Sequence, residues 1–99
     1  MKLVRIASLP ADSLDAAAAF HAEWAGKVRE EGADVLLVLP PADHAHRKWR
    51  LGAVQELARE AAPRRVNAIA SSDEAAIDRA RDYLATAPGI TGQYLPLTK

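Results

Sequence analysis

Asp43, His44 and His46, in the stretch Asp-His-Ala-His, form the one cluster of side chains in this sequence that could coordinate a metal or transfer protons. Imidazole is the commonest metal ligand in proteins and titrates near neutral pH. Two histidines spaced two positions apart, in a chain without cysteine, still supply fewer ligands than a zinc site requires. We therefore expect a solvated loop here and no bound metal.

Two serines and two short basic runs are the other polar features that could contact a ligand. Ser71 and Ser72 follow the stretch VNAIA, which predicts a strand. In an open parallel sheet, residues just past the carboxyl ends of the strands line the ligand crevice, so these serines would lie near residues 40–46. The basic runs contain Arg47, Lys48, Arg50, Arg64 and Arg65, and we expect them to be solvated helix ends.

Charge and composition exclude several classes of protein. Thirteen basic residues balance thirteen acidic ones, and the two signs are interspersed. Nucleic acids and anionic membranes need a basic stripe, so we predict neither as a partner. The N-terminus has a charge within its short apolar run and predicts neither a signal peptide nor a membrane span. With no cysteine for disulfides, the sequence fits a soluble cytoplasmic protein.

Strands and helices are expected to alternate along the chain. The run VLLVL has no polar residue, which is typical of a strand covered on both faces of a parallel sheet. Apolar stripes, capping residues, glycines and prolines delimit the helices. The expected strands are 3–7, 35–39, 66–70 and 93–97; the expected helices are 13–31, 48–62 and one that opens with a capping box at Ser71 and Glu74 and ends at Pro88.

This order predicts an α/β fold, βαβαβαβ, with a four-stranded, mainly parallel sheet and three helices. If the strands lie in chain order and every crossover is right-handed, all three helices cover one face of the sheet. The opposite face would then be bare, although VLLVL has the pattern of a strand buried on both faces. Self-association is the simplest way to cover it.

The stretches ELAREAAPRRVNAIA and DEAAIDRARDYLATAPGITGQYLPL resemble the last helices and strands of the short-chain dehydrogenase/reductase family. The resemblance implies that residues 1–99 form one truncated Rossmann-like domain. It would correspond to the fourth through seventh strands of that fold, without the dinucleotide-binding first half.

The resemblance also implies that the family's chemistry has been lost. The positions of the catalytic tyrosine and lysine hold Asp43 and Arg47, and the sequence contains no Tyr-x-x-x-Lys. Leu39, Pro40 and Pro41 replace the catalytic serine, and no glycine-rich turn follows a strand. We therefore predict no NAD(P) or other cofactor and no enzyme activity.

Family members associate through the helices that correspond to 13–31 and 48–62, and also through the closing helix and strand. The resemblance therefore implies a homo-oligomer, a dimer or a tetramer, or pairing with an intact dehydrogenase subunit. The candidate interface residues are Phe20, Trp24, Trp49 and Tyr83, although the tryptophans could equally pack inside their own subunit.

Two functions remain open at this point. The first is a non-catalytic module that associates with itself or with a partner. The second is a small ligand-binding protein or enzyme that uses the crevice at the strand ends, lined by Asp43, His44, His46, Ser71 and Ser72.

Overall fold

The computed structural model describes residues 1–97 and contains one four-stranded sheet. Its strands are β1 (Lys2–Arg5), β2 (Val35–Leu39), β3 (Val66–Ala70) and β4 (Tyr94–Pro96). They lie in the order β1-β2-β3-β4, and every neighbouring pair is parallel. The predicted α/β class is confirmed, and the two outer strands are shorter than expected.

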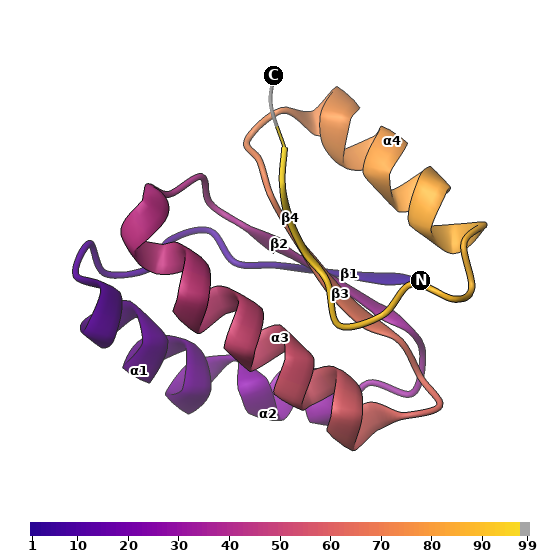
Figure 1. The fold of residues 1–99 in the computed structure, drawn as a ribbon, viewed down its shortest axis with the longest axis horizontal. Helices are drawn as coiled ribbons and strands as arrows, with labels where there is room; N and C mark the ends of the chain where they lie inside the picture. Colours follow the sequence, from indigo (N-terminus) through magenta and orange to yellow (C-terminus); the bar gives the residue numbers. More distant parts are fainter. Residues whose placement is uncertain (98–99) are drawn as a thin grey trace.

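Helices pack on both faces of this sheet (Figure 1). They are α1 (Ser13–Glu23), α2 (Ala25–Glu30), α3 (Arg47–Ala61) and α4 (Glu74–Ala85), with a 3-10 turn, η1 (His44–His46), before α3. Figure 1 shows α1, α2 and α3 on one side of the strands and α4 on the other. Among residues 1–97, no helix has the length and apolar character needed to cross a bilayer.

The first predicted helix is interrupted at Trp24, which divides it into α1 and α2. Asp12 caps α1, because its carboxylate accepts a hydrogen bond from Asp15 N at 3.0 Å. Trp24 has φ −117° and ψ −33°, and this turn leaves Ala25 and Val28 buried, each 1% exposed. The observed end lies within one residue of the expected one, since α2 ends at Glu30 and Glu31, with extended backbone (ψ 136°), is its C-cap residue.

Alternation along β2 divides the core into two layers. Val35, Leu37 and Leu39 pack with residues of α1, α2 and α3, whereas Leu36 and Val38 pack with residues of α4. Every residue of β2 is buried. The prediction from VLLVL is thus confirmed, and one chain provides the cover for both faces.

The expectation that all helices share one face is wrong. Ile77 and Leu84 of α4 pack with Leu36, Val38 and Ile69 on the face opposite α3. Because the strands follow chain order, the β3–α4–β4 connection has the opposite hand to the two connections before it. The sheet face that was predicted to be bare, and to require self-association, is therefore covered by α4.

Arg65, at the start of β3, explains why α4 lies on this face. Its backbone N and its Nε donate to the two carboxylate oxygens of Asp34, at 2.8 and 3.0 Å. Its Nη1 donates to the carbonyls of Leu84 and Ala87, each at 2.8 Å, at the end of α4. A cation at a helix C-terminus is also favoured by the helix dipole. Arg65 is therefore a buried anchor for α4 and not the predicted solvated helix end.

Asn67 holds the turn that leads into β4. Its side chain donates to Ile90 O at 2.9 Å and accepts from Gln93 N at 3.1 Å, and the residue is fully buried. Between these contacts, Gly92 has φ +74°, a conformation that glycine adopts without strain. The side chain of Thr91 accepts from Val66 N at 3.1 Å. The sequence ITGQ is thus a structural turn.

The start of α4 differs in detail from the predicted capping box. Asp73 caps the helix by accepting from Ala75 N at 3.1 Å, and Ser71 instead accepts from Asp73 N at 3.0 Å. Farther along the helix, Tyr83 is 60% exposed. Asp73, and not Ser71, is the N-cap residue because it directly precedes the first helical residue, Glu74.

We expect Asp34→Asn to lower the free energy of unfolding by about 1–2 kcal/mol at neutral pH, because it replaces charge-assisted hydrogen bonds to Arg65. The Arg65 backbone hydrogen bond, together with its guanidinium, holds the pKa of Asp34 below the usual value of 3.8, against a smaller opposing effect of burial. The stabilisation is therefore present above the unfolded-state pKa and is lost as pH falls through the lower folded-state pKa. Urea unfolding of both proteins between about pH 7 and pH 2.5 measures this difference.

The exposed Asp82 provides the matched control, and Asp82→Asn should change stability by less than about 0.5 kcal/mol. A stability difference for Asp34→Asn that does not diminish in acid would show that the charge of Asp34 is not its source.

Candidate functional site

Two separate cavities lie at the carboxyl ends of the strands, and Ala7, Pro40 and Pro41 line both of them. The β1–β2 cavity has a volume of about 340 Å³ and is lined by residues 7–11 and 40–43, together with His46 and Arg50. The β2–β3 cavity has a volume of about 260 Å³, and its lining includes Ser71, Ser72 and Glu74. The structure thus divides the predicted crevice: Asp43 and His46 line one cavity and the two serines line the other.

His46 is a buried structural residue, only 7% exposed. Its Nδ1 lies 3.0 Å from Trp49 Nε1, and its Nε2 lies 3.0 Å from Ala11 O. Because an indole nitrogen can only donate, Nδ1 must accept, which assigns the proton to Nε2 and makes the ring neutral. Both ring nitrogens are therefore used to join the loop before α1 to the first turn of α3, and neither is free to bind a metal.

Asp43 and His44 do not complete a site with His46. Asp43 caps η1 by accepting a hydrogen bond from Ala45 N at 3.1 Å, and His44 is exposed. Within residues 1–97, no three His, Cys, Asp or Glu side chains come together as metal ligands would. The sequence pattern is thus explained by a capped turn and one buried histidine.

The β2–β3 cavity contains an ion pair that the sequence did not indicate. Arg5 of β1 donates from both terminal nitrogens to the carboxylate of Glu74, each at 3.0 Å. Ser71 is used at the start of α4, and Ser72 is exposed. The cation and the anion at this cavity therefore neutralise one another.

Arg50 is the functional candidate that the sequence analysis missed. It was expected at a solvated helix end, but it is 2% exposed and lines the β1–β2 cavity. Its Nη1 donates to Pro40 O at 2.8 Å and to the Tyr94 hydroxyl at 3.1 Å. Helical spacing could have located it, since Arg50 precedes the buried Val54 and Leu57 by four and seven positions on one face of α3.

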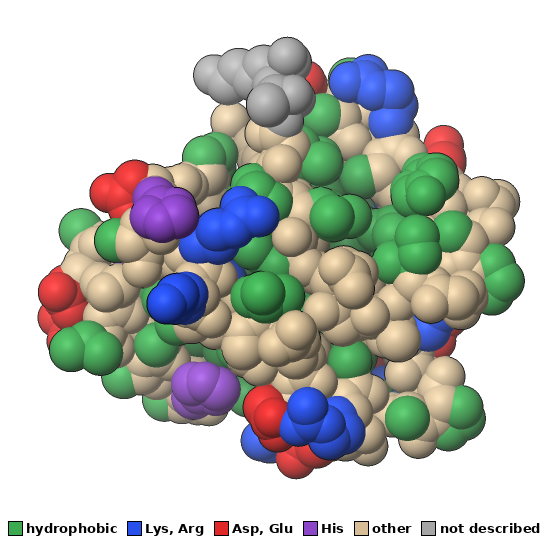
Figure 2. Space-filling view, viewed as in Figure 1, with side chains coloured by type: hydrophobic (Ala, Val, Ile, Leu, Met, Phe, Trp, Pro, Cys, Tyr) green, Lys and Arg blue, Asp and Glu red, His purple; other side chains and the backbone are tan. Residues whose placement is uncertain are grey.

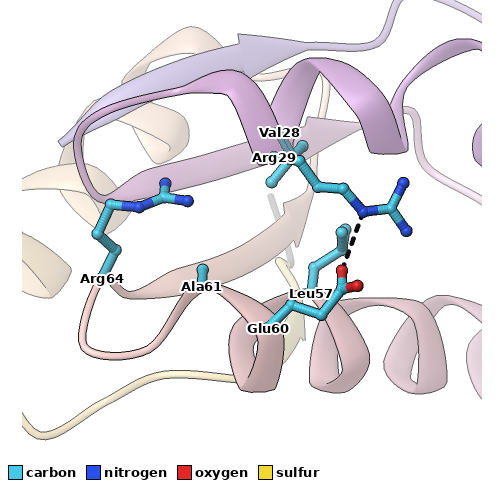
Figure 3. Close-up of a pocket in the computed structure, with 6 residues that line it drawn as sticks. All are labelled: Val28, Arg29, Leu57, Glu60, Ala61 and Arg64. Atoms are coloured by element: carbon cyan, nitrogen blue, oxygen red, sulfur yellow. Dashed lines mark hydrogen bonds and ion pairs between the residues drawn. The ribbon is translucent and has the colours of Figure 1, made fainter.

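A third hollow lies between α2 and α3 and has a volume of about 190 Å³. Figure 3 shows Val28, Leu57 and Ala61 lining it, with Arg29 bound to Glu60 at the rim. The two atoms of this ion pair are 3.0 Å apart, but both side chains are more than half exposed. Exposed ion pairs contribute little to stability, so we interpret this hollow as part of the packing contact between α2 and α3.

The four candidate interface residues differ in how far they reach the surface. The prediction that Phe20 lies at an interface is wrong. Its side chain is 1% exposed and packs beside Trp49, with ring centres 5.7 Å apart, so it offers no surface to a partner. Trp49 is half-buried and tied to His46, and the half-buried Trp24 lies under the ammonium of Lys27 at 4.3 Å. Tyr83 alone among the four is exposed.

Tyr83 borders an apolar groove between α4 and the edge strand β4. The groove has a volume of about 440 Å³ and is lined by Ala76, Arg79, Ala80, Tyr83, Leu84, Leu95, Pro96 and Leu97. Figure 2 shows apolar side chains gathered over α4 and beside β4. We call this surface the α4–β4 groove.

We expect His46→Ala to lower the free energy of unfolding by about 2 kcal/mol, because Ala11 O and the Trp49 indole N–H lose their buried partner. Chemical denaturation measures the loss. His44→Ala is the control and should stay within about 0.5 kcal/mol of the unmodified protein, since His44 is exposed. Equal stability of the two variants would contradict the structural role of His46.

Comparison with known proteins identifies the family. A family model described as SDR-like, short chain dehydrogenase-like protein, matches residues 4–97. No curated protein and no solved structure matches the chain. The family match begins within β1 and covers the other three strands and all the helices described above, so the chain belongs to the short chain dehydrogenase-like family.

Proposed function

We propose that this protein is a non-catalytic, self-associating module of the short chain dehydrogenase-like family. The α4–β4 groove carries the proposal, because it combines an apolar hollow with an exposed aromatic side chain at its border. Exposed apolar surfaces of this kind commonly mark protein contacts, and tyrosine is enriched where such contacts are strongest.

The non-catalytic part of the proposal rests on the residues at the positions of the family's catalytic pair. Asp43 stands at the tyrosine position and is used to cap η1, and Arg47 stands at the lysine position. A carboxylate that accepts a backbone hydrogen bond does not replace a phenol that donates a proton. The nearby His46 has both ring nitrogens in structural hydrogen bonds.

A second copy of this chain is the occupant that fits the groove. In a two-fold contact each subunit presents the same surface, so Tyr83 of each copy can enter the groove of the other. The outward side chains of α4 have both signs, Asp78, Arg79, Arg81 and Asp82, which permits opposite charges to meet across the two-fold axis.

Packing through α4 is favoured over extension of the sheet through β4. The strand has only three residues, Tyr94–Pro96, and Pro96 has no N–H to donate to another strand. Short edge strands with proline resist pairing with a further strand. We therefore place the helix α4, and not the strand edge, at the centre of the contact.

Tyr83→Glu should weaken self-association at least about tenfold, equivalent to about 1.4 kcal/mol, by placing a charge in an apolar contact. Light scattering over a range of protein concentrations gives the dissociation constant. Leu14→Glu is a matched control, because Leu14 is an 80% exposed apolar residue on α1, away from the groove, and its replacement should not change the oligomer.

An unmodified protein that stays monomeric at every concentration would contradict self-association. Co-elution of that monomer with an intact dehydrogenase subunit, lost on Tyr83→Glu, would assign the groove to a different partner. An oligomer that both substitutions leave intact would show that another surface makes the contact.

A further inference from the structure

Arg50 places a positive charge at the β1–β2 cavity without an acidic partner. It is 2% exposed, and among residues 1–97 the four ion pairs of the structure do not include it. Asp43 lines the same cavity, but its carboxylate is used at η1. Buried charges are normally paired, so an unpaired guanidinium beside a cavity indicates an absent anion.

The orientation of the guanidinium leaves one edge without partners. Both hydrogen bonds of Arg50 leave from Nη1, and Nε has no partner among the described residues. The rings of Trp49 and Tyr94 lie 5.7 and 5.8 Å from Cζ and flank the group. Nε is enclosed by protein, so Nη2, which makes no hydrogen bond to the described residues, is the nitrogen that can donate to an anion in the cavity.

The first turn of α3 is rich in cations, and Asp43, which caps η1, is the acidic residue just before it. The turn contains Arg47, Lys48 and Arg50 and no acidic residue. The N-terminus of a helix has a partial positive charge. Cationic side chains in the first turn are therefore unfavourable, and acidic side chains are usually found there. A bound anion would offset both the excess of cations and the helix dipole.

We propose that the β1–β2 cavity binds a small organic anion, whose carboxylate or phosphate group is held by Nη2 of Arg50. The cavity volume of about 340 Å³ lies in the range of small-molecule sites. Its lining is mainly apolar, from Ala7, Leu9, Pro10, Pro40 and Pro41, and so suits a ligand with a short hydrocarbon body. This inference is independent of the α4–β4 groove, which is formed by other residues.

Asp43 provides a sharp test because it opposes the proposed ligand. Its carboxylate lines the cavity, so Asp43→Asn removes a repulsion of the anion. Asparagine caps helices about as well as aspartate, so η1 should be retained. If Arg50 only stabilised the fold and bound no anion, Asp43→Asn would not be expected to strengthen anion binding.

The experiment is a titration of the whole chain with inorganic phosphate and, separately, with acetate, at constant ionic strength set with sodium chloride. Nuclear magnetic resonance of the Arg50 Nε–H and the Trp49 indole N–H reports the site, since Trp49 lies beside Arg50. We expect saturation with a dissociation constant of about 1 mM. Asp43→Asn should tighten binding by roughly threefold to tenfold, and Arg50→Met should abolish it.

Arg59→Gln on α3 is the control for general charge effects and should bind as the unmodified protein does, since Arg59 is exposed and lines neither this cavity nor the α4–β4 groove. Saturation by phosphate alone would assign a phosphate ligand, and saturation by acetate alone or by both probes would assign a carboxylate-compatible site. No saturation, or equal binding by the protein and its folded Arg50→Met variant, would overturn the proposal. If Arg50→Met does not fold, Asp43→Asn decides: tighter binding supports the site, and unchanged binding contradicts it.

Discussion

The hydrogen bonds of Arg65 are the constraint on which the arrangement of this protein depends. One side chain, 12% exposed, connects Asp34 before β2 with the carbonyls of Leu84 and Ala87 at the end of α4. It thereby holds α4 across the face of the sheet opposite α3. With Ile77 and Leu84 packed there, β2 is covered on both faces without a second chain.

Two candidate surfaces follow from this arrangement, on different parts of the molecule. Because α4 and β4 are adjacent, their apolar side chains border a groove beside the exposed Tyr83. On the other face, α3 places Arg50 beneath the carboxyl ends of the strands, against Pro40 O and the Tyr94 hydroxyl. Tyr94 connects the two regions, since it belongs to β4 and contacts the guanidinium of Arg50.

The fold of this short chain dehydrogenase-like chain depends on packing and on turns. Asn67 and Gly92 form the turn into β4, and apolar residues occupy the faces between helices and sheet. In the polar stretch that follows β2, Asp43 caps η1 and His46 uses both ring nitrogens in hydrogen bonds. The same fold can therefore present a different surface chemistry, because function depends on the site and not on the scaffold.

The sequence by itself determined the alternation of strands and helices and the bounds of β2 and β3, because these depend on periodicity and on neighbours a few residues apart. Only the tertiary structure decided the face covered by α4, the burial of Phe20 and Arg50, and the division of the strand-end crevice into two cavities. The physical reason is that these features depend on contacts between distant residues, such as Arg65 with Ala87 and Arg50 with Tyr94, which local patterns do not encode.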